Sequence, residues 1–312
     1  MRVDNLAVPG ANLYYEVRGA GPVLLLVCGG VYDAAGYAQL AEHFADRYTV
    51  VTYDRRGNSR SPLADPAERQ SIEVHSDDAA RLLSAVGVTA DAPAEVFGNS
   101  SGAIIALDLA ARHPESVRTV VAHEPPLFEL LDDRDRWRTL IRSVEETFQT
   151  AGPWAALETL NIGFAAEAGA DEADAAGLPA GGEGPAEAEG HSAAEADAEA
   201  EAEAAPAADG LGPDAGADAE TVARMQQNLA FFVGYEVPPF AEYLPDLAAL
   251  GAVSVVPAVG EGSNGEPWVR AAQALAERLG TQAAAFPGDH GGFGTEHQEF
   301  AARLDAIFRA AT

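Results

Sequence analysis

Short apolar runs and helical stretches alternate along most of the chain, and this alternation restricts the fold more than any other feature. The expected strands lie at 12–19, 23–30, 48–54, 95–100, 117–124, 253–260 and 282–288. The runs at 23–30 and 48–54 do not alternate polar with apolar residues, which is typical of strands buried on both faces. The expected helices lie near 34–46, 72–86, 101–112, 267–280 and 296–310. Such an order predicts an α/β fold with a mostly parallel sheet covered on both faces.

One stretch departs from the alternation, because no strand pattern occurs between Pro125 and Gly251. It holds helical patterns at 135–149 and 220–237 instead. Open α/β sheets bind their ligands at the carboxyl edge of the strands, so a helical insertion at this edge is expected to form a cap. The expected division is an N-terminal core part at 1–126, a cap at 127–250 and a C-terminal core part at 251–312.

The segment from Ala165 to Glu220 differs in composition from the rest of the chain. It contains no arginine and almost no large apolar residue, and it is rich in alanine, glycine and glutamate. A stretch of low hydrophobicity with one sign of charge cannot bury enough surface to offset the entropy lost on ordering. The sequence therefore predicts a disordered insert in the cap at about 165–220, serving as a solvated linker or as an acidic regulatory segment.

The overall composition disfavours several classes of partner. The formal net charge is −30 and every basic residue is arginine, so nucleic acid and anionic membrane surfaces are not expected partners. No apolar run reaches the roughly 20 residues of a membrane span. The N-terminus lacks the apolar segment of a secretory signal, and we expect a soluble, cytoplasmic protein. The single cysteine, Cys28, excludes an internal disulfide and a cysteine-based metal cluster.

The strand at 95–100 runs into two serines enclosed by glycines, in the order Gly98, Asn99, Ser100, Ser101, Gly102. This is a G-x-S-x-G pattern, and a strand before it with a helix after it is the setting of a nucleophile elbow. Glycines allow the sharp turn, and free N–H groups at the start of a helix favour a developing negative charge. We predict Ser100 as the nucleophile and the N–H of Ser101 as an oxyanion donor. The alternative is a glycine-rich packing turn.

A serine nucleophile needs a base. His290 lies in the glycine-rich segment FPGDHGGF (286–293), directly after the last expected strand, where its ring can reach the edge of the sheet. The rival is His123, at the end of the strand at 117–124, since other histidines lie on expected helices, at a helix end or in the acidic insert. We predict His290 as the base.

Together these motifs resemble the α/β-hydrolase fold family. VTYDRRGNSRS (51–61) resembles the family's D-x-R-G-x-G-x-S segment, with Ser59 in place of the usual second glycine. LLLVCGG (24–30) resembles its strand and H-G turn, with Cys28 in place of the histidine. The resemblance covers everything but the acidic insert and implies about eight strands, with a helical cap after the sixth. It also implies Gly30 as the other oxyanion donor.

The triad acid is where the chain departs from the family's common pattern. The family commonly carries aspartate a few residues after the seventh strand, whereas this chain has Gly262 and Ser263 there. A minority branch, including some haloalkane dehalogenases, takes the acid from the end of the sixth strand, where this chain has Glu124. We predict Glu124 as the acid. The alternatives are Glu261, Asp289 or no acid.

The predicted function is a serine hydrolase that cleaves an ester-like bond of a small, partly apolar substrate through an acyl-enzyme. A serine in place of an aspartate nucleophile disfavours dehalogenase and epoxide hydrolase chemistry. No metal or organic cofactor is implied, and a homodimer is compatible with the sequence. The alternatives are a cofactor-free lyase or oxygenase on the same fold with His290 as base, or a non-catalytic binding scaffold.

The expected cap is rich in aromatic residues, and some of them are expected to line the pocket. They are Trp137, Phe148, Trp154, Phe164, Phe231, Phe232, Tyr235, Phe240 and Tyr243.

Overall fold

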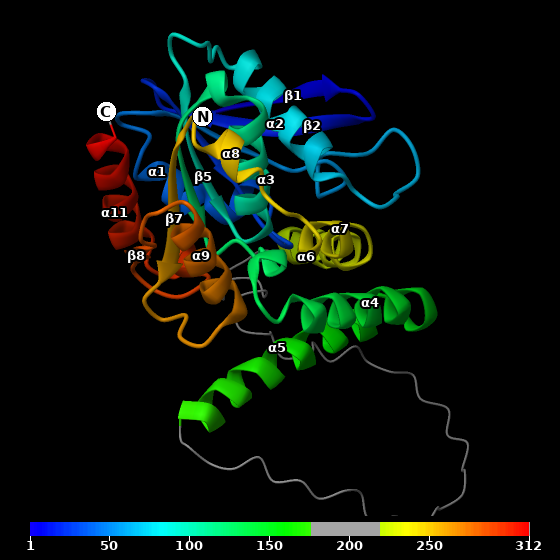
Figure 1. Cartoon of the computed structure of the whole chain (residues 1–312). Coiled ribbons are helices and arrows are strands. Elements are labelled where there is room, and N and C mark those ends of the chain that lie inside the picture. The colour runs from blue at the N-terminus through cyan, green and yellow to red at the C-terminus, as the bar shows by residue number, and fades with distance from the viewer. Residues whose placement is uncertain (176–218, 312) are drawn as a thin grey trace, which may run out of the picture.

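A computed structural model describes residues 1–175 and 219–311. Its centre is one eight-stranded sheet in the order β1-β2-β4-β3-β5-β6-β7-β8 (Figure 1). The strands are β1 (Arg2–Val8), β2 (Ala11–Arg18), β3 (Val23–Val27), β4 (Thr49–Tyr53), β5 (Ala94–Asn99), β6 (Val117–His123), β7 (Ser254–Gly260) and β8 (Ala284–Phe286). The pairs β1–β2 and β2–β4 are antiparallel, and every other pair is parallel. The mostly parallel sheet predicted from the alternation is confirmed.

Alternate side chains of the central strands enter two separate apolar layers. Along β3, Leu25 and Val27 belong to one buried cluster, whereas Leu24 and Leu26 belong to the other. Successive side chains of a strand point to opposite faces. A strand covered on both sides is therefore apolar at nearly every position, which is why these runs do not alternate.

Helices cover both faces of the sheet (Figure 1). The first apolar layer carries α2 (Ile72–Ala85), α3 (Ser101–Arg112) and α9 (Pro267–Arg278), and the second carries α1 (Ala38–Glu42) and α11 (His297–Ala310). Shorter turns are η1 (Ala34–Tyr37), η2 (Pro114–Ser116), η3 (Phe128–Leu130), α8 (Leu247–Leu250) and α10 (Gly292–Thr295). None of the helices that the structure describes is long and apolar enough to cross a membrane.

The first strand, β1, was not located from the sequence. It lies at the edge of the sheet and pairs with β2. Of its residues only Val8 is buried, and Leu6 is half-buried. Because an edge strand with most side chains in solvent needs no apolar pattern, its sequence carries little strand signal.

Between β6 and β7 the described part of the chain contains helices and no strand, as predicted. We call α4 to α7 the insertion helices; in Figure 1, α4 and α5 lie below the sheet, and α6 and α7 lie above α4 at the lower right of the sheet. They are α4 (Arg134–Ala151), α5 (Pro153–Ala175), α6 (Ala219–Phe231), the π-helical turn η4 (Phe232–Glu236) and α7 (Val237–Ala241). They share an apolar cluster of their own, which includes Val144, Leu160 and Leu229.

The segment expected to be disordered, 165–220, lies mostly outside the described residues. Its beginning belongs to α5, which continues to Ala175, and its end belongs to α6, which begins at Ala219. The structure therefore has helix at 165–175 and 219–220, where disorder was expected. Alanine and glutamate, which dominate these ends, are good helix formers and extend a helix already begun.

His123, the last residue of β6, is enclosed by aromatic side chains. The rings of Phe97, Phe286 and Phe300 are centred 6.4, 5.8 and 5.3 Å from its own. It is fully buried, and neither ring nitrogen has a hydrogen-bond partner among the described residues. Burial lowers the pKa of His123 to about 4, so the ring is neutral near pH 7.

This buried imidazole predicts a loss of stability in mild acid. The folded protein keeps His123 neutral down to a pKa of about 4, whereas the unfolded chain takes up a proton below pH ~6.5. Stability is therefore complete above that pH and is lost as pH falls below it. His123→Phe removes this proton uptake and suits the aromatic surroundings. Between pH 7.5 and pH 5, urea unfolding should show the variant gaining about 2 kcal/mol on the wild type.

Because His123→Phe is compared with the wild type at each pH, the contributions of other titrating groups to the stability difference cancel. His75 is also fully buried, with its pKa lowered well below the ordinary value by burial, but it titrates equally in both proteins. A stability difference between variant and wild type that is the same at both pH values would contradict the prediction.

Candidate active site

The serine-containing turn has the geometry of a nucleophile elbow. β5 ends at Asn99, α3 begins at Ser101, and Ser100 between them has φ 54° and ψ −128°. A residue other than glycine is strained in this region, and such strain is concentrated at functional sites. The Ser100 N–H donates to the His123 carbonyl at 2.9 Å, and the Ser100 carbonyl accepts from Ala103 at 2.9 Å. The predicted strand, turn and helix around Ser100 are confirmed.

Glycines let the backbone pass this closely. A Cβ on Gly98 would lie 2.5 Å from the Gly102 oxygen, and a Cβ on Gly102 would lie 2.2 Å from the Val27 oxygen. Gly29, after β3, is equally confined, because its Cβ would lie 2.4 Å from the Asn99 oxygen. A side chain at any of these positions would force the backbone apart. The elbow and the loop after β3 are therefore packed backbone against backbone.

The structure brings Glu124 and His290 together. Nδ1 of His290 lies 2.6 Å from Oε2 of Glu124, and Oε1 of Glu124 accepts the Gly260 N–H at 2.7 Å. Glu124 directly follows β6, is fully buried and has a φ of 48°. Burial by itself would raise the pKa of this carboxyl, but the hydrogen bond from His290 leads the interactions that outweigh burial, and the pKa is lowered. An ionised carboxylate is thus fixed against the imidazole.

His290 is also tied to the elbow. Asn99 Nδ2 donates to the His290 carbonyl at 3.1 Å. The Ser100 hydroxyl makes no hydrogen bond within the described residues, and catalytic hydrogen bonds often tighten only when substrate is bound. Ser100, Glu124 and His290 follow β5, β6 and β8, so all three lie at the carboxyl edge of the sheet.

The alternative acids and the rival base have other surroundings. Glu261 is exposed and makes no contact with His290 among the described interactions. Asp289 is exposed as well, and its Oδ1 accepts the Gly291 N–H at 2.8 Å. His123 is enclosed by aromatic rings. Of the predicted acids, Glu124 is the one in contact with the imidazole.

Gly30, the other predicted oxyanion donor, lies against the elbow. It has a φ of 51°, and its N–H donates to Oγ of Ser101 at 2.9 Å. The sequence pattern predicted a role for the N–H of Ser101 but not this contact of its hydroxyl. The contact depends on a loop 71 positions away in the chain, which no local pattern reveals.

An aromatic residue that no sequence motif marked lies beside the histidine. The Trp268 ring, at the start of α9, is centred 4.7 Å from the His290 ring, and Phe164 of α5 is centred 5.4 Å from Trp268. Of the aromatic residues expected in the cap, Trp137 is buried against Phe128 and Trp154 is exposed. The sequence feature that could have indicated Trp268 as a site residue is its position shortly after β7, at the carboxyl edge of the sheet.

Two departures from the family's motifs are accommodated. Burial raises the pKa of Cys28 to about 12, and its Sγ lies 3.2 Å from the Tyr32 carbonyl oxygen. Ser59 takes a φ of 47°, which glycine adopts more readily. Its hydroxyl lies 3.0 Å from Asp33, and its N–H donates to the Asn228 side chain at 2.7 Å. The bond from the hydroxyl to Asp33 is one that glycine could not form, whereas the backbone N–H bond to Asn228 is open to either residue.

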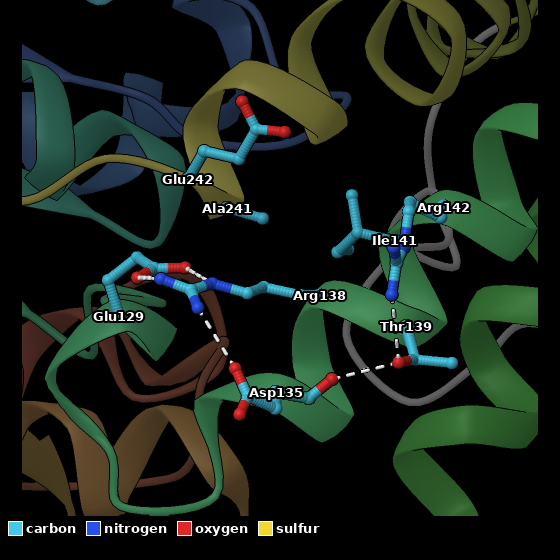
Figure 2. Close-up of a pocket in the computed structure, with 8 residues that line it drawn as sticks. All are labelled: Glu129, Asp135, Arg138, Thr139, Ile141, Arg142, Ala241 and Glu242. Carbon is cyan, nitrogen blue, oxygen red and sulfur yellow. Dashed lines mark hydrogen bonds and ion pairs between the residues drawn. The ribbon is translucent and has the colours of Figure 1, made fainter.

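A cavity of about 540 Å³ is lined by none of these residues. Figure 2 shows the residues that line it. Its lining residues are Glu129, Asp135, Arg138, Thr139, Ile141, Arg142, Ala241 and Glu242. Arg138 reaches Glu129 and Asp135, to which it donates at 2.7 and 2.9 Å. Its charge is thus already neutralised, and we assign the cavity no catalytic part. No group of three metal-ligating side chains is arranged to hold an ion in the described ranges.

Known proteins resemble this chain in sequence. The family model described as the alpha/beta hydrolase fold matches residues 22–153 of this chain. A protein named as the uncharacterized hydrolase YraK of Bacillus subtilis (strain 168) is 35% identical, over 97% of this chain and 96% of its own length. The sequence relationship thus extends across almost the whole of both proteins.

Solved structures share the fold. A thermophilic esterase from Thermogutta terrifontis has a TM-score of 0.66 at 17% identity, covering 100% of this chain and 99% of its own. The enol-lactonase from Burkholderia xenovorans LB400 has a TM-score of 0.59 at 16% identity, covering 98% of this chain and 100% of its own. With its eight-stranded sheet, its elbow and a hydrolase relative matched end to end, the chain belongs to the α/β-hydrolase family.

Proposed function

We propose that this protein is a serine hydrolase that cleaves an ester-like bond of a small, partly apolar molecule through an acyl-enzyme. The observation that carries the proposal is the 2.6 Å contact between His290 and the buried Glu124 carboxylate, at the sheet edge where a serine occupies a strained elbow after β5. The names of two similar structures, an esterase and an enol-lactonase, agree with ester chemistry.

The contact with Glu124 supports a separate role for each nitrogen of His290 in this proposal. An ionised carboxylate can only accept a hydrogen bond, so Nδ1 carries the hydrogen and Nε2 keeps a lone pair. Nε2 takes the Ser100 proton as Oγ bonds to the substrate carbonyl carbon, and then gives it to the departing alkoxide. Water next attacks the acyl-enzyme with Nε2 as base again, and the acid and free Ser100 are released.

Two backbone N–H groups, those of Ser101 and Gly30, are the proposed donors to the oxyanion. Ser101 begins α3, where the N–H is not used within the helix. The Gly30 N–H is occupied by the neutral Ser101 hydroxyl at 2.9 Å. Because a charged acceptor binds an N–H roughly twice as strongly as a neutral one, we infer that this N–H passes to the oxyanion as the charge develops.

The insertion helices act as a cap in this proposal. The chain then divides into core parts at 1–126 and 251–312 and a cap at 127–250. Support comes from Phe164 of α5, which packs on the Trp268 ring beside His290. Aromatic walls with few polar groups are typical of sites for small, largely apolar ligands. An uncharged ester with a modest acyl group is therefore the expected substrate.

A fluorophosphonate probe should label the protein once, on Ser100. Ser100→Ala should abolish labelling, because the attacking oxygen is gone, and His290→Ala should slow it by about 10³-fold or more, because no base removes the proton. Mass spectrometry of the intact protein and of its peptides measures both effects.

The neighbouring serine provides the matched control. Ser101→Ala keeps the backbone and should still be labelled once, on Ser100. Labelling of Ser100→Ala at the wild-type rate would exclude the proposed nucleophile. Substrate turnover that persists in Ser100→Ala but not in His290→Ala would favour the lyase or oxygenase alternative.

Glu124→Gln should lower kcat by roughly 10³ to 10⁴ with little change in KM. The amide preserves shape, but it leaves the imidazole in the wrong tautomer and its cation without a partner. Steady-state hydrolysis of p-nitrophenyl esters measures the effect. Glu261→Gln is the control, and it should change kcat less than about tenfold because Glu261 is exposed. The reverse pattern would place the acid after β7.

A further inference from the structure

We call residues 28–33, which follow β3, the oxyanion loop. Its peptide carbonyls are bound by side chains from distant segments. Arg55 donates through Nη1 to the Cys28 oxygen at 2.6 Å and through Nη2 to the Gly30 oxygen at 2.8 Å. Asn228 donates to the Val31 oxygen at 2.9 Å. Three carbonyls of a short loop are thus held from outside it.

Arg55 also connects this loop to the insertion helices. It follows β4 and is fully buried, and its Nη2 lies 2.7 Å from Oε2 of Glu236, which is fully buried at the end of η4. A guanidinium is planar and forked, so one group can hold two carbonyls and a carboxylate at fixed angles. The free-energy cost of removing two charges from water offsets much of their electrostatic attraction. A gain in stability is therefore a weak explanation for this pair, and a role in geometry is a better one.

Helix α6 makes a second set of contacts with the same loop. Besides binding the Val31 carbonyl, Asn228 accepts the Ser59 N–H, and Arg224 lies 3.0 Å from Asp33. Arg224 and Asn228 are four positions apart and so share one face of α6. The Val31 side chain belongs to the apolar cluster of the insertion helices. Both the polar and the apolar parts of the loop therefore depend on the insertion.

Fixing these carbonyls fixes the N–H groups of the loop. A peptide unit is planar, so the direction of a carbonyl determines that of the next residue's N–H. Arg55 holds the peptide planes on both sides of the Gly29–Gly30 peptide, whose N–H is the proposed oxyanion donor. Glycines restrict their own backbone less than any other residue. The peptide itself is bound by the Tyr32 N–H, which lies 3.2 Å from the Gly29 oxygen, and by the Ser101 hydroxyl, which the oxyanion would displace. Once that hydroxyl is displaced, the planes held by Arg55 supply much of the peptide's orientation.

We propose that Arg55 is a positioning residue for the oxyanion hole, and that Glu236 and Asn228 make the geometry of the oxyanion loop depend on the docking of the insertion helices. The inference rests on the proposed serine hydrolase activity and extends it. The insertion then does more than enclose the substrate: it holds the donor that stabilises the tetrahedral intermediate.

Two variants test the inference without removing a buried charge. Arg55→Lys keeps the charge opposite Glu236, but an ammonium cannot fork to two carbonyls and a carboxylate. Asn228→Ala removes the contact of α6 with Val31. Losing a whole oxyanion donor costs about 10²- to 10³-fold in kcat, so a misplaced donor should cost about 30-fold in Arg55→Lys and about tenfold in Asn228→Ala. KM should stay within about threefold, because the effect arises in the transition state.

Glu242→Gln is the matched control. Glu242 follows α7 and pairs with the core residue Arg69, so this pair also joins insertion to core. Neither residue has a described hydrogen bond or ion pair with the oxyanion loop. Both are exposed, and exposed pairs contribute little. The control should keep kcat within about twofold of the wild type.

A spectroscopic measurement separates positioning from a merely structural role. Infrared spectra of an acyl-enzyme made with a ¹³C-labelled carbonyl report how strongly the oxyanion hole polarises that bond. The band should move to higher frequency in Arg55→Lys and Asn228→Ala and remain in place in Glu242→Gln. Thermal unfolding of each variant, measured in parallel, shows how much of any loss in activity follows from unfolding.

The outcomes distinguish this inference from the proposed function. Wild-type kcat and an unshifted band in both variants would overturn the positioning role while leaving the hydrolase proposal intact. The positioning role would also be overturned if the loss of activity in each variant equalled the fraction of that variant that is unfolded. A wild-type protein that forms no acyl-enzyme and takes no label on Ser100 would overturn both.

Discussion

Backbone packing between β5, the start of α3 and the loop after β3 determines where the nucleophile and the oxyanion donors of the proposed site lie. The glycines at 98, 102 and 29 remove the side chains that would separate these segments. The close approach turns the chain at Ser100, starts α3 behind it, and places the Gly30 N–H within 2.9 Å of the Ser101 hydroxyl. A residue with a Cβ in this contact would move the nucleophile and the oxyanion donors together.

Buried charges give the neighbouring loop its shape. Residues 54–61, which follow β4, carry three arginines, and each pairs with a carboxylate from a different part of the chain. Arg55 pairs with Glu236 of the insertion, and Arg56 pairs with Asp78 of α2 at 2.7 and 2.8 Å. Arg60 turns back to Asp54 of its own segment at 2.7 Å. Forked pairs of this kind fix direction as well as distance. The segment therefore acts as a junction between sheet, helix layer and insertion.

Contiguous residues were enough to predict most of the sheet and the elbow. Buried strands are encoded in runs such as 23–27, and the elbow is encoded within 98–102, so both could be read locally. The contact of Glu124 with His290 followed from topology, since both residues come directly after strands whose carboxyl ends meet at one edge.

What could not be predicted depends on distant partners or on weak patterns. Arg55 and Glu236 are 181 positions apart, and neither shows in the sequence that it is buried. β1 lacked a signal because its edge position leaves most side chains in solvent. Helix at 165–175 was missed for another reason: composition favoured disorder, while the helix begun at Pro153 continued through it.

The buried state of Cys28 has a practical chemical consequence. Thiol reagents attack through the thiolate, and burial raises the pKa of this thiol to about 12. It is the one cysteine in the sequence, and the chain contains no lysine. A cysteine introduced at the exposed Trp154 position of α5 would therefore be the one readily alkylated thiol. A single dye or spin label on the insertion could then report its movement relative to the sheet, with the native cysteine left in place.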